Sequence, residues 1–169
     1  PPVGTRVVDT REDMLEESED ASKELIREGW RHVSAPPQYV EEHWPLSVAS
    51  IDGTARYTSV AGRRGLCVFD AKLDKWRVFG DVSQERNLEV VALMWCRDAI
   101  VAIAHNERAP EHEVLLYPHD TLDRSALLAR FPLPASRPLC WDIRGDVMLV
   151  LDDACVLTRY LFVWPEGAG

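Results

Sequence analysis

The sequence has no apolar run that approaches the roughly 20 residues a membrane-spanning helix needs. It also has no signal peptide, so we expect a cytosolic chain without a transmembrane segment. The chain begins Pro1-Pro2 without an initiator methionine. We therefore expect it to be an excerpt of a longer protein.

An excess of positive charge is missing as well. The 19 Lys and Arg residues are outnumbered by 28 Asp and Glu residues, and the formal net charge is −9. A nucleic-acid-binding protein needs a basic footprint to displace counterions, and a generic binder of anionic membranes needs one for the same reason. We therefore expect neither as the main partner.

The common catalytic signatures GxxxxGK[ST], GxGxxG, HExxH and GxSxG are absent. The Gly62-Arg63-Arg64-Gly65 tetrad lies between two expected strands, so it lacks the helix N-terminus that makes glycine-rich loops bind phosphate. We interpret it as a tight hairpin, with Gly65 at a positive φ. Asp152-Asp153 is interpreted as a turn, because adjacent strand residues face opposite ways. We predict no catalytic residue and no cofactor.

Cys-x-x-Cys pairs are also missing, since Cys67, Cys96, Cys140 and Cys155 are isolated. We interpret them as reduced core cysteines of a cytosolic protein rather than as a disulfide framework.

Three histidines, His105, His112 and His119, recur at intervals of seven residues. This spacing aligns side chains only on a helix, and Pro110 and Pro118 interrupt the segment. In a region of strands and loops the three need not converge, so we predict no metal site.

Acidic residues dominate the first part of the chain. Residues 1–29 contain nine acidic and four basic side chains. Thr10 followed by Asp13 resembles a capping box, but the apolar stripe is thin, which leaves a short helix and a disordered acidic insertion or tail as alternatives. Ala35-Pro36-Pro37 predicts an extended connector within residues 30–44.

From Trp44 onward, short β-type runs alternate with turn residues. The expected strands are 46–51, 57–61, 66–69, 75–79, 90–95, 99–104, 114–117, 127–131, 139–143, 147–151 and 155–163. Units begin near Leu46, Val90 and Leu139, which are 44 and 49 residues apart, and this interval is typical of β-propeller blades.

The predicted fold class is therefore all-β. We expect a WD40-like β-propeller fragment of about two and a half four-stranded blades over residues 45–163, followed by a linker at 164–169. A β-sandwich is the alternative, because it also has short strands at regular spacing.

Tryptophan is frequent, with six residues. Trp76, Trp95 and Trp141 lie in expected strands, and we predict that they pack between blades, Trp76 and Trp141 largely buried. Trp44 is predicted to plug the entry to the first blade. Stacking against a ligand is the alternative for each.

One hairpin region is locally basic within this acidic chain. Its residues are Arg63, Arg64, Lys72, Lys75 and Arg77. They form either a solvated surface or an electrostatic contact with an acidic protein partner. These five are the candidate partner-binding residues.

Seven short stretches carry a family resemblance through their order and spacing. They are Trp-Arg-His-Val at 30–33, Trp-Pro-Leu-Ser-Val-Ala-Ser-Ile-Asp at 44–52, Val-Ala-Gly-Arg-Arg-Gly-Leu at 60–66, Lys-Trp-Arg-Val-Phe-Gly at 75–80, Ser-Gln-Glu at 83–85, Val-Leu-Leu-Tyr at 114–117 and Leu-Asp at 122–123. Together they resemble the second-propeller region of the RIC (ribosome control protein one) family. Residues 1–28 do not match, and residues 93–96 depart from the family pattern.

The resemblance implies the large subunit of a heterodimeric guanine nucleotide exchange factor for the Golgi Rab-six GTPase (Ypt-six in yeast). It implies an Rgp-one-type partner subunit, peripheral recruitment to the Golgi membrane, and a role in retrograde and intra-Golgi vesicle transport. It carries no exchange residue onto this sequence.

The missing catalytic motifs are compatible with that role. An exchange factor binds the nucleotide-free GTPase more tightly than the loaded one, and this weakens nucleotide binding without an acid–base pair. The alternatives are a generic scaffold propeller of a vesicle coat or ubiquitin-ligase adaptor and, third, a propeller hydrolase.

Overall fold

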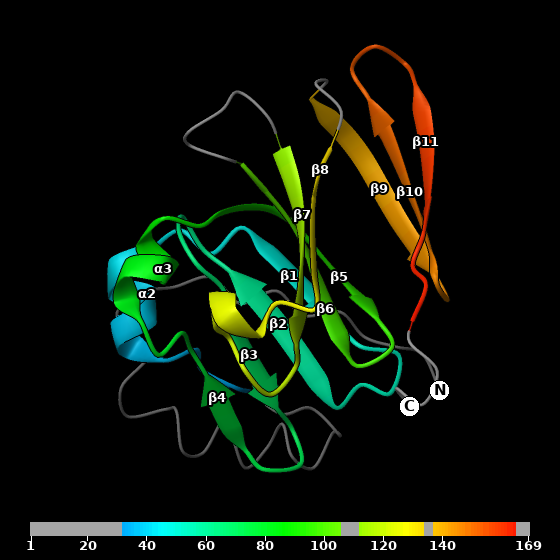
Figure 1. Cartoon of the computed structure of the whole chain (residues 1–169). Helices are drawn as coiled ribbons and strands as arrows, with labels where there is room; N and C mark the ends of the chain where they lie inside the picture. The colour runs from blue at the N-terminus through cyan, green and yellow to red at the C-terminus, as the bar shows by residue number, and fades with distance from the viewer. Residues whose placement is uncertain (1–31, 106–111, 134–136, 165–169) are drawn as a thin grey trace, which may run out of the picture. The chain divides into compact units, whose positions relative to one another are not determined.

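The computed structural model describes residues 32–105, 112–133 and 137–164 (Figure 1). The chain divides into two compact units, residues 1–35 and 36–169, and the helices and strands of the described residues lie in the second. The acidic segment expected to be helical or disordered, residues 1–29, lies outside the described residues.

The described strands form three antiparallel sheets, each made of strands that follow one another in the sequence. The first sheet contains β1 (Val48–Ile51), β2 (Tyr57–Ala61), β3 (Cys67–Asp70) and β4 (Lys75–Arg77). The second contains β5 (Glu89–Cys96), β6 (Ala99–His105), β7 (His112–Pro118) and β8 (Ala129–Pro132). The third contains β9 (Pro138–Arg144), β10 (Val147–Asp152) and β11 (Leu157–Leu161).

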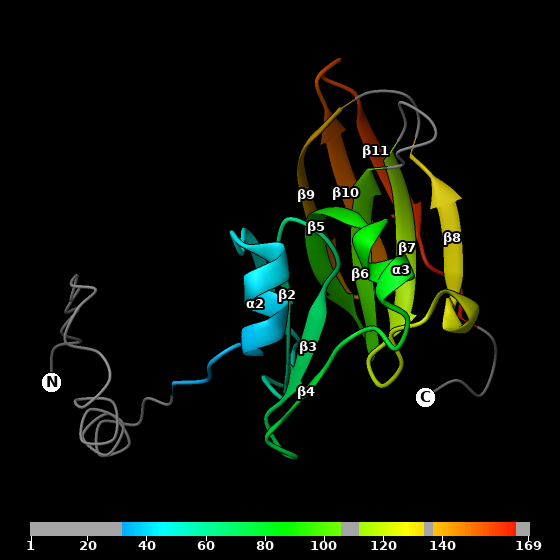
Figure 2. The same cartoon turned by 90° about the vertical axis from the view of Figure 1, so that its left-hand side faces the viewer.

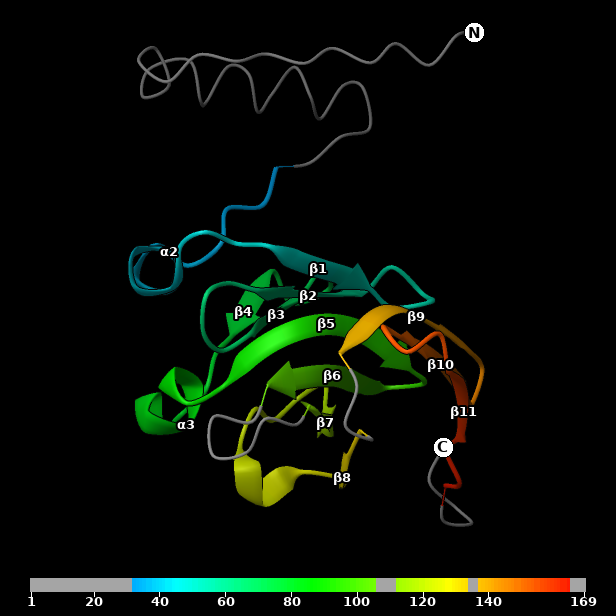
Figure 3. The same ribbon diagram turned by 90° about the horizontal axis from the view of Figure 1, so that it is seen from above.

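The first strand of each sheet lies beside the first strand of the next. β1 contacts β5, and β5 contacts β9, so β1, β5 and β9 are the neighbouring inner strands of successive blades (Figure 3). This arrangement of meander sheets is that of a β-propeller and differs from the Greek-key connections of a β-sandwich. The prediction of about two and a half blades is confirmed.

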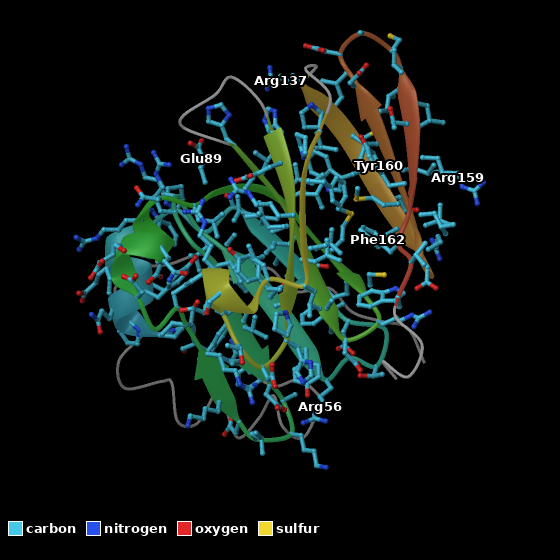
Figure 4. All side chains as sticks on the ribbon, viewed as in Figure 1. Arg56, Glu89, Arg137, Arg159, Tyr160 and Phe162 are labelled. Carbon is cyan, nitrogen blue, oxygen red and sulfur yellow. The ribbon has the colours of Figure 1, made fainter. Side chains whose placement is uncertain are left out.

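Two hydrophobic clusters fill the spaces between the blades. One joins the first and second sheets through residues such as Leu66, Val68 and Ile100. The other joins the second and third sheets through residues such as Val101 and Met148, and Tyr160 and Phe162 pack there against Phe131 of β8 (Figure 4). The second sheet is therefore covered on both faces.

The sequence of strand β6 reflects this burial on both faces. Ile100, Ala102 and Ala104 belong to the first cluster, whereas Val101 and Ile103 belong to the second. Successive residues of a strand face opposite sides, so burial on both sides requires a continuous apolar run rather than an alternating one.

Outside the sheets, the described residues form two α-helices and the one-turn 3-10 helix η1 (Arg124–Ala126), and none of the three was predicted. Helix α2 (Pro37–His43) stands where Pro36-Pro37 predicted an extended connector. The prediction was wrong because Pro37 is the first helical residue, where its fixed φ and missing N–H are tolerated. Tyr39 and His43, one turn apart, are the buried residues of this helix.

The second helix, α3 (Val82–Arg86), follows Asp81, whose carboxylate accepts a hydrogen bond from the Ser83 backbone N–H at 2.8 Å. This N-cap bond satisfies one of the free N–H groups of the first turn. Within the described part of the chain, neither helix has the length and apolar character needed to span a bilayer.

The tryptophan predictions are only partly confirmed. Trp95 packs between blades, stacked on Tyr57 with its indole N–H donating to the Ser50 carbonyl at 3.3 Å. Trp76 and Trp141 are half-buried rather than largely buried, since Trp76 lies on the short outer strand β4. Trp44 is 61 % exposed and does not plug the first blade.

All four cysteines are free thiols, but only two lie in the core. Cys67 and Cys96 are buried as predicted, whereas Cys140 and Cys155 are exposed. The prediction was wrong for these two because Cys140 alternates with the inward-facing Trp141 on β9, and Cys155 lies in the β10–β11 turn at a φ of 59°.

Candidate partner-binding surface

The five candidate basic residues separate into two groups. Arg63 and Arg64 lie in the β2–β3 connection, and the other three lie in the β3–β4 hairpin (Figure 2). Successive connections of an antiparallel meander lie at opposite ends of the sheet, here separated by the four residues of β3, or roughly 13 Å at about 3.4 Å per residue. The sequence predicted one basic hairpin region, whereas the structure has basic residues at two opposite ends of the first blade.

In Figure 4, one labelled residue marks each of these two ends. Glu89, whose carboxylate lies 3.4 Å from the Arg64 guanidinium, marks one end. Arg56, whose guanidinium donates to Asp70, marks the other.

The glycine tetrad is clamped against its surroundings by backbone hydrogen bonds. The Gly62 N–H donates to the Tyr39 hydroxyl at 3.1 Å, and the Arg63 N–H donates to the His43 carbonyl at 2.7 Å. The Gly65 N–H donates to the Leu88 carbonyl at 2.7 Å. The tetrad therefore joins helix α2 to the segment that leads into β5.

Neither glycine of the tetrad leaves room for a side chain. A Cβ at Gly62 would stand 2.2 Å from the His43 carbonyl oxygen. Gly65 has a φ of +68°, and a Cβ there would stand 2.4 Å from Cγ of Glu85. The hairpin interpretation and the positive φ of Gly65 are confirmed, and the tetrad has a structural role.

The two arginines of the tetrad differ in environment. Arg63 is exposed, whereas Arg64 is half-buried, pairs with Glu89 at the start of β5, and its carbonyl accepts a hydrogen bond from the Tyr39 hydroxyl at 3.2 Å. Arg64 therefore ties the first blade to the second, and Arg63 is the residue a partner can reach.

At the opposite end, Asp70 organises the β3–β4 hairpin. Its fully buried carboxylate accepts hydrogen bonds from Nε and Nη2 of Arg56 at 3.3 and 3.2 Å, and from the backbone N–H groups of Lys72 and Leu73 at 3.0 and 3.2 Å. Arg77 lies 3.5 Å away. The hydrogen bonds from Arg56 are the main reason that the pKa of Asp70 falls to about 2.

This anchor was missed from the sequence, although the position of Asp70 at the last residue of a strand before a turn is a signal for it. As a result, the basic residues of this hairpin differ in their ion pairing. Arg77 is held by Asp70, whereas Lys72 and Lys75 are exposed and form no ion pair among the described residues.

A groove of about 470 Å³ lies beside this hairpin. Leu73, Lys75, Arg77, Val78 and Gly80 line one side, and residues 120–123 of the β7–β8 connection line the other. Leu73 is 57 % exposed and Val78 is 45 % exposed. Apolar and charged groups are thus presented together, which suits recognition of a protein segment.

A second cavity, of about 260 Å³, lies between α2 and α3. His43 and Glu85 line it, with Nε2 of the imidazole 3.1 Å from Oε1 of the carboxylate. Burial lowers the pKa of His43 and raises that of Glu85. The arrangement joins the two helices and supplies no nucleophile.

The three regularly spaced histidines do not converge. His119 packs against Tyr57, with ring centroids 4.4 Å apart, whereas His105 and His112 lie next to each other on β6 and β7. Among the described residues no three metal-ligating side chains gather.

Comparison with known proteins identifies relatives over 78–85 % of the chain. It is 26 % identical over 145 residues to the human guanine nucleotide exchange factor subunit RIC1, which covers 85 % of this chain and 10 % of that protein. It is 29 % identical over 134 residues to the mouse protein of the same name, covering 78 % and 9 %. It is 26 % identical over 133 residues to the Caenorhabditis elegans guanine nucleotide exchange factor subunit R06F6.8, covering 78 % and 9 %.

The chain therefore spans about a tenth of the length of these curated relatives. Among solved structures, it is similar to a chain of a mitotic checkpoint complex at a TM-score of 0.48 and 12 % identity, covering 93 % of this chain and 45 % of that one. A likeness at this level adds nothing to the assignment.

A family model described as the RIC1 second beta propeller domain matches residues 9–167. The match begins within the acidic segment that the resemblance left out, and it includes every described strand. The chain belongs to the family of RIC1 second β-propeller domains.

Proposed function

We propose that this chain is part of the second β-propeller of a guanine nucleotide exchange factor subunit and that it acts there as a protein-interaction platform. The family match over residues 9–167 carries this proposal. The three relatives named as exchange factor subunits support it. The exchange activity belongs to the assembled complex, and this segment contributes surface rather than chemistry.

The finer proposal follows from the family resemblance. The complex contains an Rgp-one-type partner subunit and acts on a Rab-six-type small GTPase. It works from the cytoplasm as a peripheral protein of the Golgi membrane, in retrograde and intra-Golgi vesicle transport.

The physical requirements of exchange agree with this role. Exchange needs a surface that binds one state of the GTPase more tightly than another, and such discrimination requires that the surface stay rigid. Here the blades are joined by buried clusters and by hydrogen bonds between sheets, such as that of Trp95 with Ser50.

Within the platform, we assign partner contact to the exposed basic side chains at the two ends of the first blade. Lys72 and Lys75 lie on the hairpin beside the 470 Å³ groove, and Arg63 lies at the other end. Exposed charges of this kind act mainly on the rate of encounter with an acidic partner.

The test is release of a fluorescent guanine nucleotide from a Rab-six-type GTPase. We expect the complex of full-length subunit and Rgp-one-type partner to accelerate release, and the 169-residue chain alone to have no effect. An unrelated Rab is the matched control for specificity. A complex that accelerates release from neither GTPase contradicts the exchange role, and acceleration by the isolated chain contradicts the non-catalytic platform.

A further inference from the structure

Two imidazoles meet at one end of the β6–β7 hairpin. His105 is the last residue of β6, His112 is the first residue of β7, and the two are partners in the antiparallel register. Directly paired residues project from the same face of a sheet. Their ring centroids lie 5.4 Å apart with the planes inclined by 58°, and both residues are partly exposed.

This separation agrees with shared coordination of a tetrahedral metal ion. With a Zn–N bond of about 2.0–2.1 Å, each ring centroid lies about 3.2 Å from the metal, and two rings at a tetrahedral angle have centroids about 5.2 Å apart. Two rings at a right angle, as in octahedral sites, would have centroids about 4.5 Å apart at the same bond length. The observed 5.4 Å is closer to the tetrahedral value than to the octahedral one.

A carboxylate continues the row on the neighbouring strand. Glu89 of β5 is the register partner of His105, so Glu89, His105 and His112 follow one another across three strands. Imidazoles that bind metals commonly donate their second N–H to a carboxylate in the outer shell. Glu89 is available for this because its side chain is half exposed, although it also pairs with Arg64.

Two charged groups lie near this pair of imidazoles. Arg137 adds positive charge on this side and Glu89 adds negative charge, so their effects on a cation oppose each other.

We propose that His105 and His112 form a two-imidazole site for a divalent first-row transition metal, best suited to zinc, with Glu89 as an outer-shell carboxylate. Among the described residues, the two imidazoles are the protein ligands of the proposed site. The proposal does not depend on the exchange factor role.

The test is titration of zinc alone into the 169-residue chain, followed by calorimetry and by the NMR signals of the imidazoles. The exposed thiols are first removed by Cys140→Ser and Cys155→Ser, since thiolates also bind zinc. We expect His105→Gln and His112→Gln each to weaken zinc binding at least about tenfold. Loss of an outer-shell partner alone already weakens metal binding by about that factor. Copper(II) should show two nitrogen ligands by electron paramagnetic resonance.

His119→Gln is the matched control, because this ring packs against Tyr57 and should leave zinc affinity unchanged. Circular dichroism verifies that each variant is folded. Absence of zinc binding at millimolar concentration overturns the proposal. So does binding that survives His105→Gln and His112→Gln, or that His119→Gln weakens equally.

Discussion

The guanidinium of Arg97 donates two hydrogen bonds to the carboxylate of Asp146, at 2.8 and 2.7 Å. Arg97 lies in the β5–β6 turn and Asp146 in the β9–β10 turn, so this bidentate pair joins the second and third blades. The indole N–H of Trp164 donates to the same carboxylate at 3.0 Å, and the guanidinium lies over that ring.

We expect Arg97→Ala and Asp146→Ala each to lower the thermal midpoint, and the double variant to lower it by no more than the larger single effect. Residues that act through one shared interaction are not additive. Differential scanning fluorimetry of the three variants measures the coupling. Additive losses would mean that the two side chains contribute independently of their hydrogen bonds.

Gly62 is the most restricted glycine of the described residues, and Gly62→Ala should therefore destabilise the chain. The added Cβ would meet the backbone carbonyl of His43, which cannot move without displacing α2. We expect a loss of about 1–3 kcal/mol, as for other overpacked positions. Urea denaturation measures it.

The control for this substitution is Gly53→Ala, since nothing lies within 4 Å of a Cβ built there. Its effect should stay within about 0.5 kcal/mol, as for ordinary surface changes. Equal losses at Gly62 and Gly53 would contradict the close approach to α2 as the source of the cost.

Reversal of Lys72 and Lys75 to Glu in the full-length subunit should slow its association with the Rgp-one-type partner subunit or the Rab-six-type GTPase at low salt. The defect should shrink as salt rises, because screening reduces the effect of exposed charges. Stability should change by less than about 0.5 kcal/mol, since both side chains are exposed. Surface plasmon resonance at two salt concentrations provides the association rates.

Arg63→Glu is the comparison, because it changes charge at the opposite end of the same blade without removing the Arg64–Glu89 pair. A defect confined to the lysines assigns the contact to the groove end, and one confined to Arg63 assigns it to the tetrad end. Unchanged rates for both variants would leave the basic residues as a solvated surface only.

Stability should fall as the pH is lowered from about 7.5 to 5.5 because of His43. Its pKa in the folded chain lies below the ordinary 6.5, chiefly through burial, so the unfolded chain binds the proton first and is favoured as the pH falls. Glu85, Glu42 and Arg86 are the charged groups that surround it. His43→Gln removes the titration and should flatten this part of the curve.

The measurement is the urea midpoint of wild type and His43→Gln across that pH range. The other histidines titrate in both proteins, so the difference between the curves belongs to His43. Parallel curves would contradict the assignment.

Much of the fold was predictable, because apolar runs and turn residues mark the strands and their spacing marks the blades. Strand β2 was predicted at its observed bounds, Tyr57–Ala61. The short helices were not, since α2 and α3 have too few residues for a periodic pattern and depend on Pro37 and Asp81 at their starts.

The candidate surface was harder to predict than the fold. Arg64 and Lys72 are eight residues apart in the sequence, yet β3 carries them to opposite ends of a blade. Linear proximity of basic residues therefore indicated one surface where the sheet forms two. Arg64 pairs with Glu89 and Arg77 pairs with Asp70, and local sequence patterns do not reveal such pairings.

The double burial of β6 has a consequence for how substitutions act along one strand. Even-numbered positions such as Ile100 and Ala102 face the first blade, whereas odd-numbered positions such as Val101 face the third. A truncation at Ile100 should speed hydrogen exchange of the backbone amides of β2 and β3. A truncation at Val101 should speed that of the amides of β9 and β10. Neighbouring residues of a single strand thus govern hydrogen exchange on opposite sides of the second blade.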